Sequence, residues 1–457
     1  MRALLATSIG VTCAAALTLP LAVPASAAPV VRTSATESAE PSAAELPGST
    51  QSLRLSPLTP AASRATGAPT GPTAAAPQGV RQRDVRPFSL VGVVWDDADA
   101  ELHGTVQVRT RATGGTRWSG WQDLETHNAE HAADPGSPER EAGTVRGSTA
   151  PLWVGDSDGV EVRVQPGAAR PGHRAAAPQK LPEGLRLELV DPGEDAPRPP
   201  AAGAPGADRA TAPLTAESAA AAAVNADLAP LDATVIPALG KAESEEMAGV
   251  SAGAKPFVGP RPRIVTRKGW GADERLRERE FAYTKRVKAA FVHHTATGNN
   301  YRCSQAPSVL RSIYRYHVKS SGWRDFGYNF AVDKCGNIYE GRAGGVSKPV
   351  LGAHTLGFNT NSMGIAVIGT YGSSNPPAAS VKAIAKLTAW KLGLFGANPK
   401  GRTTLVSGGG NRFRKGTQVR LNVISGHRDG FATECPGWRL YKKLGTARST
   451  SARLQGR

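Results

Sequence analysis

The most informative part of this sequence is Ser425-Gly426-His427-Arg428-Asp429-Gly430-Phe431-Ala432-Thr433-Glu434-Cys435-Pro436-Gly437, taken together with Phe291-Val292-His293-His294-Thr295 far upstream. The two stretches offer three side chains whose nitrogen or sulfur atoms suit Zn²⁺: His293, His427 and Cys435. Three protein ligands leave one coordination position for water, which is the arrangement of a catalytic zinc site, whereas a structural site has four.

Spacing alone is weak evidence for this site. His427 and Cys435 lie eight residues apart, across a loop, and the apolar residues before His293 predict a buried strand. The chain has nine histidines and lacks the His-Glu-x-x-His helix motif. The fold must therefore bring a strand end and a distant loop together.

The N-terminus has the features of a secretory signal peptide. Met1-Arg2 precedes an apolar run over residues 3–23, which ends at the small-residue pattern Pro24-Ala25-Ser26-Ala27-Ala28. We expect cleavage after residue 28 and a secreted protein, extracellular or cell-wall associated. A lipid anchor at Cys13 is the alternative, but the residues before it fit a lipid-attachment box poorly. No later segment has the roughly 18 consecutive apolar residues of a membrane span.

Removal of the signal peptide would leave three of the four cysteines in an oxidising compartment. Three cysteines cannot all pair. We expect a disulfide between Cys303 and Cys335, with Cys435 as a thiolate held by a metal. An unreactive buried Cys435 is the alternative.

Positive charge is concentrated in the C-terminal half. Residues 263–457 hold 33 Lys and Arg against 9 Asp and Glu, a net charge of +24, so the rest of the +17 chain carries −7. On an exported protein this favours an anionic cell-wall polymer as partner and argues against nucleic acid. A solvated basic surface with no specific partner is the alternative. We expect a monomer.

Composition divides the 457 residues into domains and linkers. Residues 29–84 are rich in Ala and Pro and are expected to be disordered. Residues 85–195 alternate polar and apolar positions, which predicts an all-β domain of unknown role with strands over four segments: 88–95, 104–111, 159–164 and 185–190. Its four tryptophans, half of the eight in the chain, are expected in its core rather than exposed for sugar stacking.

The remaining sequence predicts a linker over residues 196–261, an α/β domain over 262–446 and a basic tail over 447–457. In the α/β domain strands are expected over 289–293, 328–332, 338–340 and 362–370, and helices over 306–318 and 376–393. Mixed strands and helices imply a central mixed sheet flanked by helices.

Seven ordered motifs in this domain resemble the peptidoglycan recognition protein family, in its catalytic branch of zinc-dependent N-acetylmuramoyl-L-alanine amidases (type 2 amidases). They are Trp270-Gly271-Ala272, Phe291-Val292-His293-His294-Thr295, Gly327-Tyr328-Asn329-Phe330, Tyr339-Glu340-Gly341-Arg342, Gly352-Ala353-His354, Asn361-Ser362-Met363-Gly364 and Gly426-His427-Arg428-Asp429 with Thr433-Glu434-Cys435-Pro436. The resemblance covers residues 262–446 and says nothing of the β domain.

The resemblance implies roles for single residues. His293, His427 and Cys435 would be the zinc ligands, and His294 would support them or be structural. Tyr328 matches the family's catalytic tyrosine, and Thr433 stands where relatives have lysine or threonine. A threonine hydroxyl can donate one hydrogen bond but brings no positive charge, so an oxyanion would depend more on zinc and Tyr328.

Four further positions match the family's substrate groove: His317, Gly322, Trp323 and His354. A histidine on a helix face is otherwise most often a buried core residue, and the Gly-Trp pair is only a weak indication of diaminopimelate-type stem peptides. The resemblance thus implies a hydrolase that cuts the bond between N-acetylmuramic acid and L-alanine of peptidoglycan. A peptidoglycan-binding protein without turnover is the alternative, although such proteins typically lack the cysteine or the tyrosine.

Overall fold

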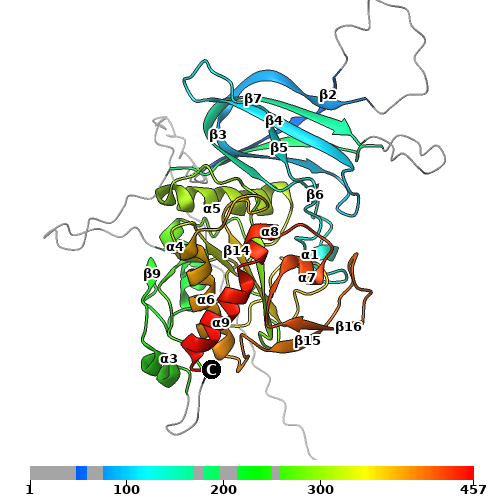
Figure 1. Ribbon diagram of the computed structural model, residues 1–457. Coiled ribbons are helices and arrows are strands. Elements are labelled where there is room, and N and C mark those ends of the chain that lie inside the picture. Colours follow the sequence, from blue (N-terminus) through cyan, green and yellow to red (C-terminus); the bar gives the residue numbers. More distant parts are fainter. Residues whose placement is uncertain (1–47, 59–75, 168–179, 195–213, 250–256) are drawn as a thin grey trace, which may run out of the picture. The chain divides into compact units, whose positions relative to one another are not determined.

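Two sheets organise the chain, an antiparallel one in its N-terminal half and a mixed one in its C-terminal half (Figure 1). The computed structural model describes residues 48–58, 76–167, 180–194, 214–249 and 257–457. The described residues all belong to one compact unit. The predicted signal peptide and Cys13 lie outside the described residues.

The antiparallel sheet has the strand order β1-β8-β3-β7-β4-β5, and β2 and β6 also pair with β3. Its strands are β1 (Ser49–Arg54), β2 (Ser56–Pro57), β3 (Gln78–Trp95), β4 (Gly104–Ala112), β5 (Gln122–Leu124), β6 (Gly147–Ser148), β7 (Leu152–Pro166) and β8 (Arg186–Asp191). The first three predicted strands lie within β3, β4 and β7, and the fourth agrees with β8 to within one residue, so the expectation of an all-β domain is confirmed. A short helix, α1 (Pro138–Glu141), lies between β5 and β6.

Two expectations for this half need correction. The segment predicted to be disordered contains β1, β2 and the first part of β3, and β1 pairs along its whole length with β8. The side chains of residues 81–87 are mostly exposed and polar, so the strand has no apolar period there and its backbone pairing was not visible in the sequence. Of the four tryptophans, Trp95 and Trp153 are buried, while Trp118 and Trp121 are half-buried.

The mixed sheet has the order β17-β11-β14-β12-β13-β10-β9. Its strands are β9 (Val235–Ile236), β10 (Ile264–Val265), β11 (Ala289–His294), β12 (Phe330–Val332), β13 (Ile338–Glu340), β14 (Ser362–Val367) and β17 (Ile424–Gly426). β11 lies between β14 and β17 and is parallel to both. A parallel strand with neighbours on both edges is buried on both faces, which accounts for its continuous apolar run.

Helices cover both faces of this sheet. The helices are α2 (Ala216–Ala223), α3 (Lys241–Met247), α4 (Arg267–Trp270), α5 (Ala306–Arg315), α6 (Ala378–Gly393), α7 (His427–Gly430), α8 (Trp438–Tyr441) and α9 (Leu444–Gln455), with a 3₁₀ turn (Cys303–Gln305) before α5 and a π-helical turn (Tyr316–Ser320) after it. On β14, Ile365 and Val367 pack in the cluster that includes α6, and Ala366 packs in the cluster that includes α5. Alternate residues of a strand face opposite sides, so α5 and α6 lie on opposite faces. The predicted α/β architecture is confirmed.

The predicted linker is partly ordered. β9 pairs with β10 at the edge of the mixed sheet, and Ile236 is fully buried in the core that α6 covers. Two residues of strand are too short to give an alternating pattern, so the Pro- and Ala-rich surroundings dominated the prediction. The α/β region therefore extends upstream of the predicted boundary.

The prediction that residues 447–457 form a basic tail outside the α/β domain is wrong. Most of these residues belong to α9, which packs on α6 (Figure 1). Ala447 and Ala452 are fully buried. Thr388 on α6 donates a hydrogen bond to Ser451 at 3.0 Å, and Gln455 donates to the Ala389 carbonyl at 2.9 Å. The small side chains of α9 allow the two helices to approach closely. Because most of them are not strongly apolar, the sequence of α9 shows no helical period of apolar residues. A two-stranded hairpin, β15 (Arg402–Val406) and β16 (Gln418–Asn422), completes the described elements.

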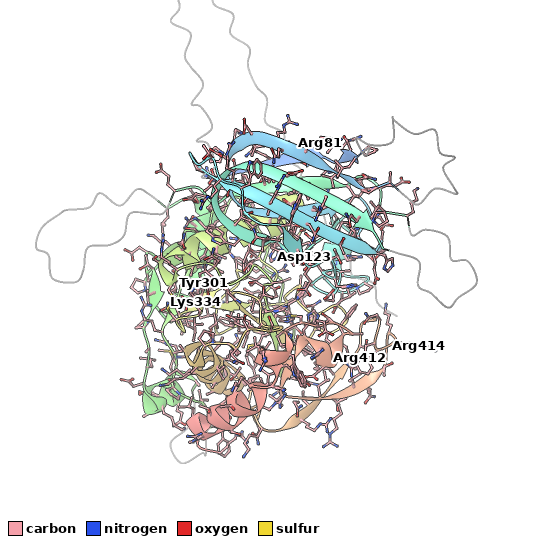
Figure 2. All side chains as sticks on the ribbon, turned by 45° about the horizontal axis from the view of Figure 1, so that its top comes forward. Arg81, Asp123, Tyr301, Lys334, Arg412 and Arg414 are labelled. Atoms are coloured by element: carbon pink, nitrogen blue, oxygen red, sulfur yellow. A yellow bond between two sulfur atoms is a disulfide. The ribbon has the colours of Figure 1, made fainter. Side chains whose placement is uncertain are left out.

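A disulfide joins Cys303 to Cys335, as expected, and Cys435 is free and buried. The disulfide ties the turn before α5 to the turn between β12 and β13. Beside it, the Lys334 backbone N–H donates to the Tyr301 hydroxyl at 2.8 Å, and the two side chains are labelled in Figure 2. No helix in the described ranges combines the length and apolar composition that a bilayer crossing needs.

Replacement of Ala447 by Asp tests the correction of the tail. Because Ala447 is fully buried, an unpaired carboxylate there should lower the free energy of unfolding by about 3 kcal/mol or more. The matched control is Ser449→Asp, two residues along on the exposed face of α9. Denaturant unfolding of both variants is the measurement, and equal stability of the two would mean that α9 does not pack on the domain.

Candidate metal centre

Strand pairing brings the two candidate histidine ligands together. His293 lies near the end of β11, and His427 is the first residue of α7, directly after β17. β11 and β17 are parallel neighbours in which Val292 pairs with Gly426, so both histidines follow at the same edge of the sheet. Cys435 lies in the loop after α7, and its carbonyl accepts a hydrogen bond from the Arg428 backbone N–H, which folds this loop back toward His427.

The predicted ligands form a cluster with a fourth residue, His131. One ligand atom from each of His131, His293, His427 and Cys435 lies within 4.8 Å of the others. His131 Nε2 is 3.2 Å from His427 Nδ1, and Cys435 Sγ is 3.8 Å from His293 Nδ1. Ligands about 2.0–2.3 Å from a tetrahedral zinc are about 3.3–3.8 Å apart, so these two separations are close to those of zinc ligands.

Sequence reasoning missed His131. It lies in the connection between β5 and β6, in the half of the chain for which the sequence predicted no site residues. The surrounding residues have no ligand spacing, and His131 is 162 positions from His293. Only the fold of the whole chain brings it to the cluster.

Burial sets the protonation of the cluster. It lowers the pKa of His131 to about 3, and it lowers the pKa values of His293 and His427 well below their usual range, with a further contribution from neighbouring histidines. The imidazoles are therefore neutral, which is the form that binds metals. His427 Nε2 and His131 Nδ1 are buried without a hydrogen-bond partner among the described residues. A set of neutral imidazoles and one thiol fits Zn²⁺.

A threonine supports His293 from behind. Thr355 Oγ1 lies 3.3 Å from His293 Nε2 and 2.9 Å from His354 Nδ1. A hydrogen bond to the second ring nitrogen orients a metal-binding histidine and fixes its tautomer. His354 is fully buried in this network, so its place here is behind the cluster rather than on an open groove.

The two predicted catalytic residues lie beside the cluster. The ring centroids of Tyr328 and His293 are 5.2 Å apart, and burial raises the pKa of Tyr328, so its hydroxyl stays protonated and can donate a hydrogen bond. Thr433 Oγ1 accepts the Cys435 backbone N–H at 3.0 Å and donates to the carboxylate of Glu130 at 2.7 Å. Burial raises the pKa of Glu130 to about 8.

The other predicted groove residues are close by but covered. His317 stacks on Trp323 with ring centroids 4.4 Å apart, and His317 Nδ1 accepts the Gly327 N–H at 3.2 Å; both side chains are buried. Gly322 has φ +74°, and a Cβ atom added there would lie 1.9 Å from the Thr144 carbonyl oxygen. His294 is outside the cluster, and its Nδ1 accepts the Tyr371 N–H.

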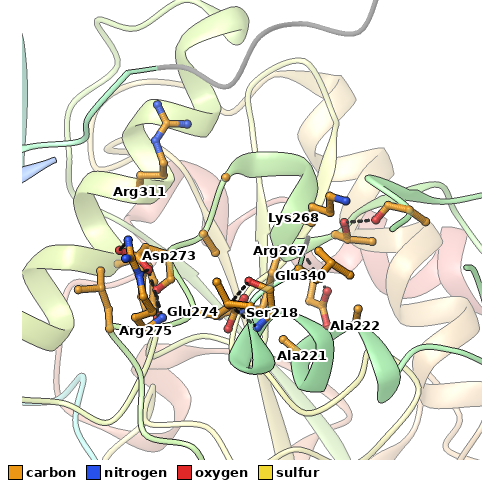
Figure 3. A pocket seen from close by; sticks show the side chains of 18 of the residues that line it. Ser218, Ala221, Ala222, Arg267, Lys268, Asp273, Glu274, Arg275, Arg311 and Glu340 are labelled. Carbon is orange, nitrogen blue, oxygen red and sulfur yellow. Dashed lines mark hydrogen bonds and ion pairs between the residues drawn. The ribbon is translucent and has the colours of Figure 1, made fainter. Parts of the chain in front are cut away.

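A cavity of about 530 Å³ lies elsewhere in the molecule, and Figure 3 shows part of its lining. Arg267 lies in its wall, where Glu274 and Asp325 bind the guanidinium at 2.6 and 3.0 Å. None of the predicted site residues lines this cavity. A void lined by His131, His317 and Tyr328 measures only about 10 Å³, which is about the space for one water molecule.

The Thr355 network predicts a measurable effect on metal affinity. Thr355→Val removes the hydroxyl behind His293 and should weaken zinc binding about 10- to 100-fold, the usual range for loss of such a partner. Competition with a chromophoric chelator measures the change, and Thr404→Val, at an exposed strand position, is the control. Equal affinity of the two variants would exclude Thr355 as a support of the metal centre.

Comparisons with known proteins match both halves of the chain. Residues 283–438 match the family model described as N-acetylmuramoyl-L-alanine amidase, and residues 33–183 match the Rv3811 N-terminal galactose-binding domain-like model. Peptidoglycan-recognition protein SC2 of Drosophila simulans is 32% identical over 185 residues, which cover 40% of this chain and 85% of that protein.

Two further proteins are similar to parts of this chain. The human protein named N-acetylmuramoyl-L-alanine amidase is 32% identical over 212 residues, 44% of this chain and 32% of that protein. Among solved structures, wild-type Drosophila PGRP-LB is 26% identical with a TM-score of 0.32, and the match covers 40% of this chain and 93% of that one. On the sequence matches, this chain belongs to the peptidoglycan-recognition protein family, with a galactose-binding-like domain before its amidase-type domain.

Proposed function

We propose that this protein is a secreted zinc-dependent N-acetylmuramoyl-L-alanine amidase, which hydrolyses the amide bond between N-acetylmuramic acid and L-alanine of peptidoglycan. The observation that carries the proposal is the meeting of His293, His427 and Cys435 within one cluster of potential ligands, with the Tyr328 ring beside it. The family match to amidases supports the substrate and the bond.

His293, His427 and Cys435 would hold the ion. Zn²⁺, when bound, would supply Lewis acidity, which lowers the pKa of a water molecule toward about 7 and polarises a carbonyl group. Tyr328 would donate a hydrogen bond to the oxygen on which negative charge develops, and the position of its ring beside His293 supports this role. The Thr433 hydroxyl is the second candidate donor, because it lies two residues before Cys435 and is bonded to that residue's N–H.

His317, Gly322, Trp323 and His354 are the proposed substrate-binding residues. The first three lie on the path from the π-helical turn to β12, and His354 lies behind His293. The basic C-terminal half would favour anionic wall polymers near the substrate; Arg412 and Arg414, labelled in Figure 2, are exposed in the connection between β15 and β16.

One observation favours a second function, peptidoglycan binding without turnover. The cluster contains four potential protein ligands, and a zinc ion with four protein ligands has no position for water. The two functions differ in product. An amidase releases new L-alanine amino termini from purified wall sacculi, whereas a binding protein releases none.

Tyr328→Phe separates the catalytic role of this tyrosine from a structural one. The variant should keep its zinc and lose about ten- to a thousandfold in turnover, the range for removal of one oxyanion donor. Mass spectrometry of muropeptides of defined stem type measures the cleaved bond and the rate together. Tyr283→Phe, at a tyrosine that is 44% exposed, serves as the control. An unchanged rate in Tyr328→Phe would show that another group stabilises the developing charge.

A further inference from the structure

We propose that residues 125–146, the connection between β5 and β6, form a built-in inhibitor that occupies the substrate site, with His131 in the coordination position that an attacking water needs. We call these residues the inhibitory segment. The proposal rests on the amidase function proposed above. It adds a regulatory part of the chain that the resemblance did not cover.

His131 stands where a catalytic zinc site would be open. Its ring centroid lies 4.5 Å from that of His427, 5.3 Å from that of His293 and 5.9 Å from that of Tyr328. It therefore touches two candidate ligands and the candidate oxyanion donor at once. Three protein ligands and one open position are the arrangement of catalytic zinc, and His131 is placed to fill the open one.

The neighbouring Glu130 engages the loop that carries Cys435. Its carboxylate accepts the Thr433 hydroxyl at 2.7 Å, and its carbonyl accepts the Leu356 backbone N–H at 2.9 Å. The Thr433 hydroxyl, which is proposed to assist the reaction, therefore already donates its hydrogen bond to the segment. Substrate could use Thr433 only after Glu130 leaves.

Further along, the segment follows the surface of the amidase-type domain. Asn359 Nδ2 donates to the Ala132 carbonyl at 2.8 Å and to Asp134 at 2.7 Å, and the Gly357 N–H also donates to Asp134 at 2.7 Å. In α1, Glu139 accepts two hydrogen bonds from the guanidinium of Arg342, at 2.7 and 2.8 Å. Both charges are buried, and this two-pronged pairing offsets the cost of their desolvation.

The end of the segment covers the Gly-Trp motif. Thr144 Oγ1 donates to the Gly322 carbonyl at 2.9 Å, and the Arg146 N–H donates to the Ser321 carbonyl at 3.0 Å. With only about 10 Å³ free beside Tyr328 and His317, a muropeptide cannot enter while the segment is in place. Segment and substrate are mutually exclusive.

The nature of these contacts allows release. The segment buries two small apolar side chains, Ala132 and Ala133, and is otherwise held by polar contacts. None of residues 125–146 belongs to the four hydrophobic core clusters of the described chain. Release of the segment would expose polar groups that water can bind, and it would leave the four hydrophobic clusters intact. A permanent structural part of the domain would instead contribute apolar side chains to the core.

The experiment uses the full chain loaded with zinc, as the parent and as His131→Ala. X-ray absorption at the zinc edge counts imidazole ligands by the multiple scattering of their rings. It should find three imidazoles and one sulfur in the parent, and two imidazoles, one sulfur and one further nitrogen or oxygen ligand in the variant. His131→Ala should also bind a soluble muropeptide more tightly and cleave wall sacculi about tenfold faster or more, because the open form is no longer a minor population. His127→Ala, an exposed histidine of the same segment, should match the parent in all three measurements.

The three readouts separate this proposal from the amidase proposal. Tighter muropeptide binding and the loss of one imidazole ligand without cleavage would support the inhibitory segment and contradict the amidase function. Water already present on zinc in the parent would overturn the role of His131, whatever the activity. A His131→Ala variant that binds and cleaves no better than the parent, or worse, would overturn inhibition and make His131 a structural or catalytic residue.

A second variant tests the segment away from the metal. Glu139→Gln removes the negative charge that Arg342 binds and leaves every candidate ligand in the chain. It should raise muropeptide binding in the same direction as His131→Ala, because the weakened docking favours the open form. No gain in either variant would overturn the proposal even if one of them folded poorly.

Discussion

The parallel pairing of β11 with β17 is the constraint on which the candidate metal centre depends. It places His293 and His427, 134 positions apart in the chain, at the same edge of one sheet. The apolar residues that bury β11 on both faces make this edge rigid, and the loop after α7 needs only to fold back for Cys435 to complete the set. A shift of β17 by one residue against β11 would change the pairing of Val292 with Gly426 and move His427 away from His293.

Burial of the imidazoles and the thiol affects both metal binding and the access of substrate to the cluster. Burial removes the charge of the histidines, and it also excludes the large, polar substrate that the family match implies. The same segment of the N-terminal half that supplies His131 also binds Thr433, Asn359 and Arg342. Residues from both halves of the chain therefore contribute to the cluster of potential ligands and to the contacts around it.

Sequence patterns predicted the parts of this structure in which local chemistry dominates. The apolar run before His293, the helical period of residues 306–318 and the two strands on either side of Cys335 all have the expected elements. Three parts were not predictable in this way. β1 and the start of β3 are held by backbone hydrogen bonds to neighbouring strands, and many of their side chains are polar. α9 packs on the domain through small residues. His131 reaches the cluster because one half of the chain packs on the other.

Anomalous diffraction at the zinc edge from crystals of the zinc-loaded full chain would locate the ion. We expect one strong peak bonded to the side chains of His293, His427 and Cys435. A peak at another place, or zinc-loaded protein whose three side chains do not share one ion, would contradict this expectation.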